Sequence, residues 1–156
     1  MSGHSSQVPS GWTGTTGASG QPKVKIINSG NADFGGTNAP SGTGNYVGLQ
    51  IGGCYMQQDV TGLTAGTTYT VSFQAAARSN HINSVGIPIK VFLNGAEIGS
   101  VTTTNNFAAN ALSLAAVAGS NVLKFQNGDT SGADKTVFLD DVVVAQATEI
   151  VHLLHL

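Results

Sequence analysis

The ten residues that decide the fold class lie at positions 68–77 and read TYTVSFQAAA. Tyr69, Val71 and Phe73 alternate with the small polar residues Thr70 and Ser72. Successive side chains of a β-strand point to opposite faces, so this alternation predicts a strand with one buried face. The stretch favours an antiparallel β-protein.

Further runs of β-type composition lie on both sides of this stretch, separated by turn residues. The predicted strands are 23–28, 46–51, 54–60, 68–77, 87–93, 97–103, 107–115, 122–126 and 136–145. Asn94 and Gly95 separate two of these runs, and because both residues tolerate positive φ they predict a tight hairpin. Residues 108–118 are rich in Ala and Leu, but Leu112 and Leu114 alternate with polar neighbours and favour a strand. Many short strands separated by turns predict a sandwich or a barrel.

The composition excludes several classes of protein. The chain has 156 residues and only 9% of them are charged, against roughly 25% in ordinary soluble domains. Six basic residues without a stripe cannot neutralise many phosphates, so we expect no nucleic-acid partner. The apolar runs are far shorter than the roughly 18 residues of a spanning helix, so we expect no membrane insertion. Cys54 is the single cysteine of the sequence and cannot form a disulfide within the chain.

Composition also divides the chain into three parts. Residues 1–22 are rich in Ser, Gly, Thr and Pro and predict an irregular N-terminal arm. Residues 23–147 carry the strand pattern and predict the β-sandwich module. Residues 148–156 read TEIVHLLHL and form an apolar C-terminal tail.

Two stretches resemble a known family. Residues 60–78 read VTGLTAGTTYTVSFQAAAR, and residues 132–142 read GADKTVFLDDV. Together with residues 89–95, they resemble the galactose-binding-like β-jelly-roll modules, which are related to carbohydrate-binding modules and occur on bacterial secreted, surface and phage tail proteins. The resemblance covers residues 45–145. It implies an all-β fold, namely an antiparallel β-sandwich with jelly-roll topology, and an extracellular glycan-binding function. The family's first strand, which precedes a Gly-Trp pair by a longer stretch, is missing or replaced here, since only ten residues precede Gly11.

One end of this sandwich is chemically richer than the other. Alternate connections of an antiparallel sandwich gather at the same end. The first end carries the amide and charged side chains Arg78, Asn80, His81, Asn83, Asn105, Asn106, Asn127, Asp129 and Asp134. The connections 61–67, 94–96 and 116–120 at the opposite end carry mostly Thr, Gly, Ala and Ser. Function lies disproportionately on loops, so we expect a ligand at the first end.

A neutral sugar is bound by amide, carboxylate and guanidinium groups together with an aromatic ring against its C–H surface. The candidate ligand-binding residues are Trp12, Tyr46, Arg78, Asn80, His81, Asn83, Asn127 and Asp129, with Tyr55 as a further aromatic candidate. Each residue type also has a structural interpretation. Loop Asn and Asp commonly satisfy turns, Arg78 could cap the sheet edge or pair with Asp129 or Asp134, and Trp12 could pin the arm. The expected ligand is a poly- or oligosaccharide.

Two aspartates suggest a metal ion. Alternation with Phe138 and Val142 predicts that Asp140 faces the core, where a carboxylate must be hydrogen-bonded, paired or metal-bound. Asp134 and Asp140 are therefore the candidate ligands of a structural calcium ion, with backbone hydrogen bonding as the alternative. No other cofactor is expected. Asp140 and Asp141 point to opposite faces and cannot act as an acid–base pair.

The sequence contains no nucleophile elbow, zinc-protease motif or phosphate-binding glycine loop. We therefore expect a non-catalytic glycan-binding module. The alternative is a structural or adhesion domain of a phage tail or a bacterial surface protein. In the tail, His152 and His155 would share one face of a helix and could bind a metal, or the segment could be a linker. The tail could also cover an open sheet edge, in the same chain or in a homo-oligomer.

Overall fold

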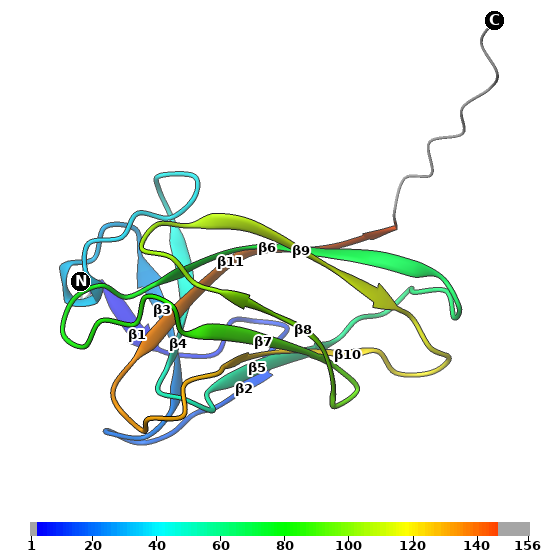
Figure 1. Cartoon of the computed structure of the whole chain (residues 1–156), viewed down its shortest axis with the longest axis horizontal. Coiled ribbons are helices and arrows are strands. Elements are labelled where there is room, and N and C mark those ends of the chain that lie inside the picture. The colour runs from blue at the N-terminus through cyan, green and yellow to red at the C-terminus, as the bar shows by residue number, and fades with distance from the viewer. Residues whose placement is uncertain (1–2, 147–156) are drawn as a thin grey trace, which may run out of the picture.

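The computed structural model describes residues 3–146, which fold into two packed antiparallel β-sheets (Figure 1). The order of the six-stranded sheet is β1–β3–β4–β11–β6–β9, and that of the five-stranded sheet is β2–β5–β10–β7–β8. Most neighbouring strands are far apart in sequence, as in β10 and β5 or β11 and β4, whereas β3–β4 and β7–β8 are consecutive pairs. The predicted all-β sandwich with jelly-roll topology is confirmed.

The strand bounds agree closely with the hydrophobic alternation. The six-stranded sheet contains β1 (His4–Ser6), β3 (Lys23–Asn28), β4 (Asn45–Gln50), β11 (Thr136–Gln146), β6 (Thr68–Ala77) and β9 (Ala108–Ala115). The five-stranded sheet contains β2 (Thr13–Gly14), β5 (Tyr55–Asp59), β10 (Val122–Asn127), β7 (Pro88–Leu93) and β8 (Ala96–Thr102). Each predicted strand is present, and β9 pairs with β6 along its whole length.

The β7–β8 hairpin forms as the sequence predicts. Leu93 pairs directly with Ala96, so Asn94 and Gly95 are the two turn residues. Both have positive φ, +49° and +82°, which matches the right-handed twist of the flanking strands. The Asn94 side chain also fixes the neighbouring loop, because its amide donates to Ser120 O and its Oδ1 accepts from Val122 N.

The N-terminal arm is more regular than the sequence indicates. Strand β1 pairs with β3 and strand β2 pairs with β5, so the arm supplies one edge strand to each sheet. Val8 and Trp12 pack against the main core. These strands have three and two residues, too few for a readable alternation. Each lies at one edge of its sheet.

The main core lies between the two sheets. Phe73 of β6 and Phe125 of β10 meet edge to face, with ring centroids 5.2 Å apart. Their neighbours are fully buried aliphatic residues on both sheets, which include Leu49, Val71, Ile89, Val91, Leu114, Leu123, Val137 and Leu139. The inward-facing residues of the predicted strands therefore form this core.

A second core lies on the outer face of the six-stranded sheet. It contains Ile27, Phe34, Ala39, Tyr46, Ala76 and Phe138, with Phe107 packed against it. Residues 29–44, which connect β3 and β4, cover this face. They include a short 3-10 turn, η1 (Ala32–Phe34), which ends at Gly35 with φ +87°. The covering segment buries Phe34 to 3% exposure.

A β-bulge overturns the predicted orientation of Asp140. Asp140 pairs with Gln74 and Val143 pairs with Ser72, so the register shifts between them, and Asp141 has φ +52°. Before the bulge Val137 and Leu139 face the main core, whereas after it Val142 and Val144 do. Asp140 therefore lies on the outer face beside Gln74. The prediction that it faces the core was wrong, because one extra residue inverts the alternation.

Among residues 3–146, no helix has the length and apolar character needed to span a membrane. The tail at 148–156 lies outside the described residues. The interpretations of it as a metal site, a linker, an edge cover or an oligomer contact therefore stay predictions.

Candidate ligand-binding groove

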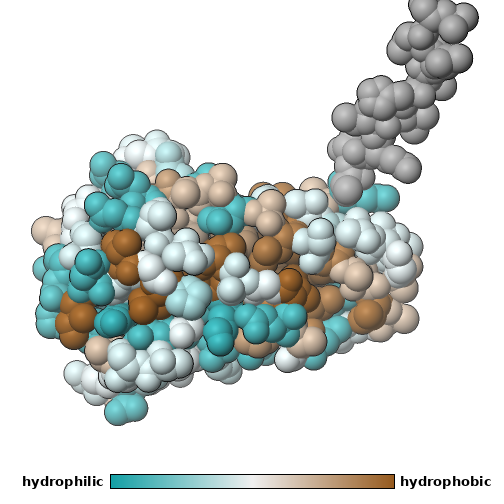
Figure 2. All heavy atoms as spheres, viewed as in Figure 1, coloured by the Kyte–Doolittle hydropathy of each residue, from teal (hydrophilic) through white to brown (hydrophobic). Residues whose placement is uncertain are grey.

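The loops predicted to share one end of the sandwich do lie together. Gly53 N donates to Asn127 O, which joins the β4–β5 and β10–β11 connections. Gly86 N donates to Thr103 O at 3.0 Å and Arg78 N to Thr136 O at 3.0 Å, which joins the remaining connections. The loops occupy the left end of Figure 1, where Figure 2 shows many strongly hydrophilic residues. Residues 29–44 reach the same end.

Arg78 is engaged in holding the covering segment. It is 8% exposed, and its Nη2 donates to Asp33 O at 2.6 Å. Its guanidinium lies 4.6 Å from the centroid of the Phe34 ring. Burial lowers the pKa of Arg78, while the nearby carboxylates of Asp134 and Asp33 act in the opposite direction. Arg78 thus clamps η1 onto the end of β6, and its side-chain hydrogen bonds go to Asn80 and Asp33 rather than to Asp129 or Asp134.

Asn80 belongs to the same clamp. Its Oδ1 accepts from Arg78 Nε at 2.8 Å, and its amide donates to Ala32 O at 3.2 Å. His81 Nε2 lies 3.4 Å from Asp134 Oδ2, with side chains 53% and 36% exposed. An ion pair this exposed contributes little to stability. Asp134, one of the two predicted partners of Arg78, contacts His81 and accepts a hydrogen bond from Gln50 at 2.9 Å.

The remaining polar candidates satisfy the protein's own backbone. Asn83 Oδ1 accepts from Val85 N at 3.0 Å, which closes an Asx turn. Asn127 is 1% exposed, and its amide donates to Leu49 O and Lys135 O. The carboxylate of Asp129 binds the Ser131 side chain at 2.6 Å. The polar atoms that these side chains would offer to a ligand are therefore already hydrogen-bonded within the protein.

Two of the three aromatic candidates, Tyr46 and Trp12, pack against the protein's own cores, whereas Tyr55 is half-buried on β5. Tyr46 is 2% exposed, and its hydroxyl donates to Thr37 O at 3.1 Å, so its ring has no face open to a sugar. Burial raises the pKa of Tyr46 to about 12. Trp12 lies against the main core, with its ring centroid 6.2 Å from that of Phe125, and so fixes the arm.

The two predicted calcium ligands do not converge. Asp134 binds Gln50 and His81 at the loop end, whereas Asp140 lies on the outer sheet face opposite Gln74. Burial raises the pKa of Asp140, while a backbone hydrogen bond from Asp141 lowers it. In the described part of the chain, no three acidic, histidine or cysteine side chains gather. This donor set does not fit a shared calcium site.

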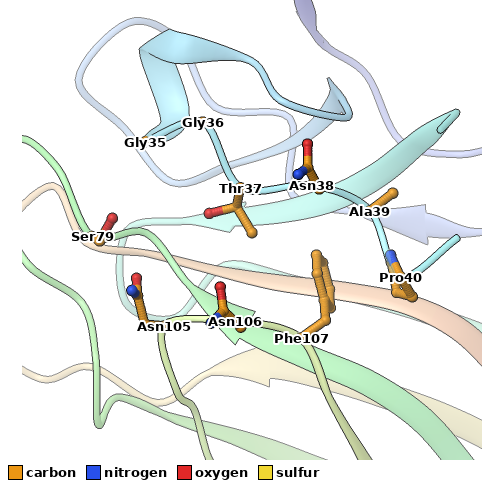
Figure 3. Close-up of a pocket in the computed structure, with 10 residues that line it drawn as sticks. All are labelled: Gly35, Gly36, Thr37, Asn38, Ala39, Pro40, Ser79, Asn105, Asn106 and Phe107. Carbon is orange, nitrogen blue, oxygen red and sulfur yellow. The ribbon is translucent and has the colours of Figure 1, made fainter. Parts of the chain in front are cut away.

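A groove at the same end has different properties. It lies between residues 35–40 and residues 105–107, with Ser79 also in its lining, and encloses about 360 Å3 (Figure 3). Its lining includes five polar side chains that make no hydrogen bond within residues 3–146, namely Thr37, Asn38, Ser79, Asn105 and Asn106. Phe107 supplies an aromatic ring beside them. Figure 3 shows Asn105, Asn106 and Phe107 pointing toward the 35–40 segment.

The two walls of the groove have fixed backbones. On one wall, Gly30 N donates to Thr37 O at 2.9 Å, and Ala39 N donates to the Ser29 hydroxyl at 2.9 Å. On the other wall, Ala77 N donates to Thr104 O at 2.8 Å, and the Thr104 hydroxyl donates to Asn106 O at 2.9 Å. Backbone bonds therefore hold both walls while their amide side chains stay free.

Phe107 is held in place by the second core. Its ring centroid lies 5.1 Å from that of Tyr46 and 6.3 Å from that of Phe138, and the residue is half-buried. The groove therefore combines one positioned ring, three amides and two hydroxyls, and its lining contains no charged side chain. Its volume falls within the range of about 300–1,000 Å3 typical of small-ligand sites. This chemistry suits an uncharged polyhydroxy ligand.

The sequence predicted that Asn105 and Asn106 lie at this end of the sandwich, but they were not among the predicted ligand-binding residues. It could not identify the facing wall, because residues 29–44 carry no strand alternation. The available signal was the adjacent Asn-Asn-Phe in a short connection. It distinguishes these asparagines from those that follow a turn pattern, such as Asn83.

No protein-family model matches the chain, and no curated protein sequence matches it. Solved structures do. The K2 cleaved adhesin domain of Lys-gingipain is similar with a TM-score of 0.63 and 18% identity, over 89% of this chain and 90% of that chain. The CBM22-1 xylan-binding domain of Xyn10C from Paenibacillus barcinonensis is similar with a TM-score of 0.61 and 13% identity, over 90% of this chain and 88% of that chain.

An exo-beta-agarase is similar with a TM-score of 0.61 and 10% identity, over 93% of this chain but only 24% of that longer chain. At these identities the likeness concerns the fold. The chain therefore shares its β-sandwich fold with a carbohydrate-binding module and with an adhesin domain.

Proposed function

We propose that this protein is a non-catalytic module that binds a neutral glycan in the groove between residues 35–40 and 105–107. The observation that carries the proposal is the set of five polar side chains without internal hydrogen bonds around Phe107. Sugar hydroxyls would pair with the amides, while the C–H face of a pyranose ring would pack on Phe107. The absence of charge from the lining favours a neutral sugar over an acidic one.

The comparisons support glycan binding in general terms. A xylan-binding domain and an agarase share the fold, and xylan and agar are polysaccharides that occur outside cells. We therefore place the protein in an extracellular setting, secreted or on a surface. The likeness to an adhesin domain favours the second candidate, a surface adhesion domain that holds no glycan in this groove.

The test uses the full chain and begins with a glycan array to select a neutral oligosaccharide. Calorimetry then measures the affinity of the wild type and of the double variant Asn105→Ala, Asn106→Ala for that oligosaccharide. Neutral hydrogen bonds contribute about 0.5–1.5 kcal/mol each, so losing two of them weakens binding roughly 30-fold. The unfolding midpoint stays unchanged, because neither amide bonds to the protein.

Asn83→Ala is the matched control, since it removes an exposed loop amide at the same end that serves only its own turn. Its affinity stays at the wild-type value. Phe107→Leu keeps the apolar packing but removes the ring, and weakens binding without unfolding the protein. The proposal is contradicted if the wild type and all three variants bind the neutral oligosaccharide with equal affinity. A protein that retains no neutral glycan at high loading supports the adhesion candidate.

A further inference from the structure

The two sheets have four edges among residues 3–146, formed by β1 and β9 in the six-stranded sheet and by β2 and β8 in the five-stranded sheet. An edge strand presents a row of backbone N–H and C=O groups that have no partner in their own sheet, and such a row can pair with a strand of another molecule. Natural proteins protect their edges with very short strands, with bulges or with charged side chains. The four edges differ in whether they carry these protections.

Three of the edges are protected. Strands β1 and β2 have only three and two residues, so they offer a second strand few pairing positions. Strand β8 has seven residues, but its register against β7 shifts between Val91 and Phe92, which leaves Ile98 as an extra residue. Such a bulge bends the strand, and the neighbouring Glu97 places an exposed charge on the same edge. A second strand therefore cannot pair with β8 along its whole length.

Strand β9 has none of these protections. Its eight residues, AANALSLA, include no charged side chain and no proline. All eight pair with β6 in one unbroken register, from Ala108 opposite Ala75 to Ala115 opposite Thr68, so the strand carries no bulge. In the described part of the chain it pairs with no other strand (Figure 1). Strand β9 is thus the longest of the four edges and the one that a second strand can extend.

The outer surface beside this edge consists of small, uncharged side chains. Leu112 and Leu114 pack against the main core, so the alternate residues of β9 face outward, and all four of them are exposed, namely Ala109, Ala111, Ser113 and Ala115. Strand β6 continues the surface with Ser72 opposite Ala111. On β11, Val143 lies opposite Ser72 and is 51% exposed. The carboxylate of Asp140 shares this face but lies two strands in from the edge.

We infer that β9 pairs with β9 of a second copy of this chain, antiparallel and about a two-fold axis, so that the two six-stranded sheets join into one. A two-fold interface brings the same patch of both copies together. Like charges opposite each other destabilise a strand pair, and β9 brings none to this contact. A foreign strand is selected by side-chain pockets or by complementary charge, whereas the outward side chains of β9 are all Ala or Ser and offer neither.

The geometry of this contact sets what can be measured. The middle of β9 meets the middle of its copy, which brings the two Ala111 side chains within reach of each other on the outer face. Eight residues on each side are fewer than the roughly 20–30 per partner of a stable complex. We therefore expect a weak dimer, with a dissociation constant of about 10–100 µM. The inference does not depend on the function proposed for the groove.

The test measures self-association of the full chain by sedimentation velocity at low ionic strength, from about 10 µM to about 1 mM protein. The weight-average mass of the wild type rises toward that of a dimer. Ala111→Lys weakens association about fivefold, because the two lysines repel each other across the contact. Ala111→Glu has the same effect, and an equal mixture of these two variants restores association through opposite charges. The matched control is Ser100→Lys, which adds the same charge at an exposed position of the β8 edge and associates like the wild type.

A second measurement needs no variant of the edge. In the wild type, backbone amides of β9 exchange hydrogen more slowly at the highest protein concentration than at the lowest, whereas those of β8 exchange at the same rate at both. Exchange in β9 that does not depend on concentration overturns the inference, and so does a wild type that stays monomeric throughout.

The variants separate this contact from its alternatives. An Ala111→Lys protein that associates like the wild type, or a mixture of the two charge variants that stays monomeric, overturns the inference. A dimer that Leu153→Lys in the tail abolishes and Ala111→Lys leaves intact overturns it in favour of the tail. The Asn105→Ala, Asn106→Ala variant associates like the wild type. A failure of the groove proposal therefore leaves this result untouched.

Discussion

The outer faces of the two sheets differ in how far they are buried beneath another segment of the chain. The six-stranded sheet buries Phe138 and Tyr46 beneath residues 29–44, so that side chains which would otherwise face water form a second core. Within residues 3–146 no segment covers the five-stranded sheet in this way, and Tyr55, Phe92 and Lys124 are partly exposed. Aromatic residues on an outer face are thus part of a core in one sheet and partly open to solvent in the other.

This difference also explains where the groove lies. Residues 35–40 of the covering segment face the 105–107 loop, and the groove lies between them. The segment stabilises the fold by burying Phe34, and its residues 35–40 present polar side chains to the groove. Arg78 and Asn80 hold this segment in place, because their side chains donate hydrogen bonds to its backbone carbonyls.

The largest effect that tests this comparison is a loss of stability. Phe34→Ala removes a ring that is 3% exposed and packs against Arg78 and Phe138, and we expect unfolding to become easier by about 3–4 kcal/mol. Phe92→Ala on the uncovered face costs at most about 1 kcal/mol. Urea unfolding of both variants measures the difference. Equal losses would show that the covering segment does not form a true second core.

A smaller effect compares burial in the two cores through pH. Burial raises the pKa of Cys54 in the main core, and that of Tyr46 in the second core, each to about 12. A pKa raised on folding means that the native state holds its proton longer than the unfolded chain. The stabilisation is complete below pH 9 and is lost as the pH rises toward 12.

For Cys54 alone, the expected decrease in unfolding free energy by pH 11 is about 2–3 kcal/mol. Urea unfolding at a series of pH values measures it. In Cys54→Ala the decrease begins about one pH unit later and is smaller, because Tyr46 then acts without the thiol. A wild-type stability that is flat between pH 9 and 11 would show that neither group is shielded from solvent.

Much of the fold could be predicted from the sequence because its strands alternate clearly. The stretch 68–77 and the Asn94-Gly95 turn encode local geometry, and both formed as predicted. Three features escaped prediction because they depend on distant contacts. Strands β1 and β2 are defined by their partners, the bulge after Asp140 by the register of β6, and the burial of Tyr46 by residues 29–44.

The candidate site was predicted only at the level of its end of the sandwich. Composition could place Asn80, Asn105 and Asn127 in neighbouring loops, but it could not tell which amides the backbone would use. Asn127 bonds to Leu49 O across 78 residues of sequence, whereas Asn105 bonds to nothing within residues 3–146. That distinction is a property of the folded chain.

The most direct test of the central claim is an NMR titration of the 15N-labelled protein with the selected neutral oligosaccharide. Asn38, Asn105 and Asn106 line the groove, so their side-chain amide signals should shift on binding. Those of Asn80 and Asn127, which are bonded to the backbone, should stay in place. Shifts confined to Asn80, Asn83 and Asn127, or to residues around Lys124, would contradict the assignment of neutral glycan binding to this groove.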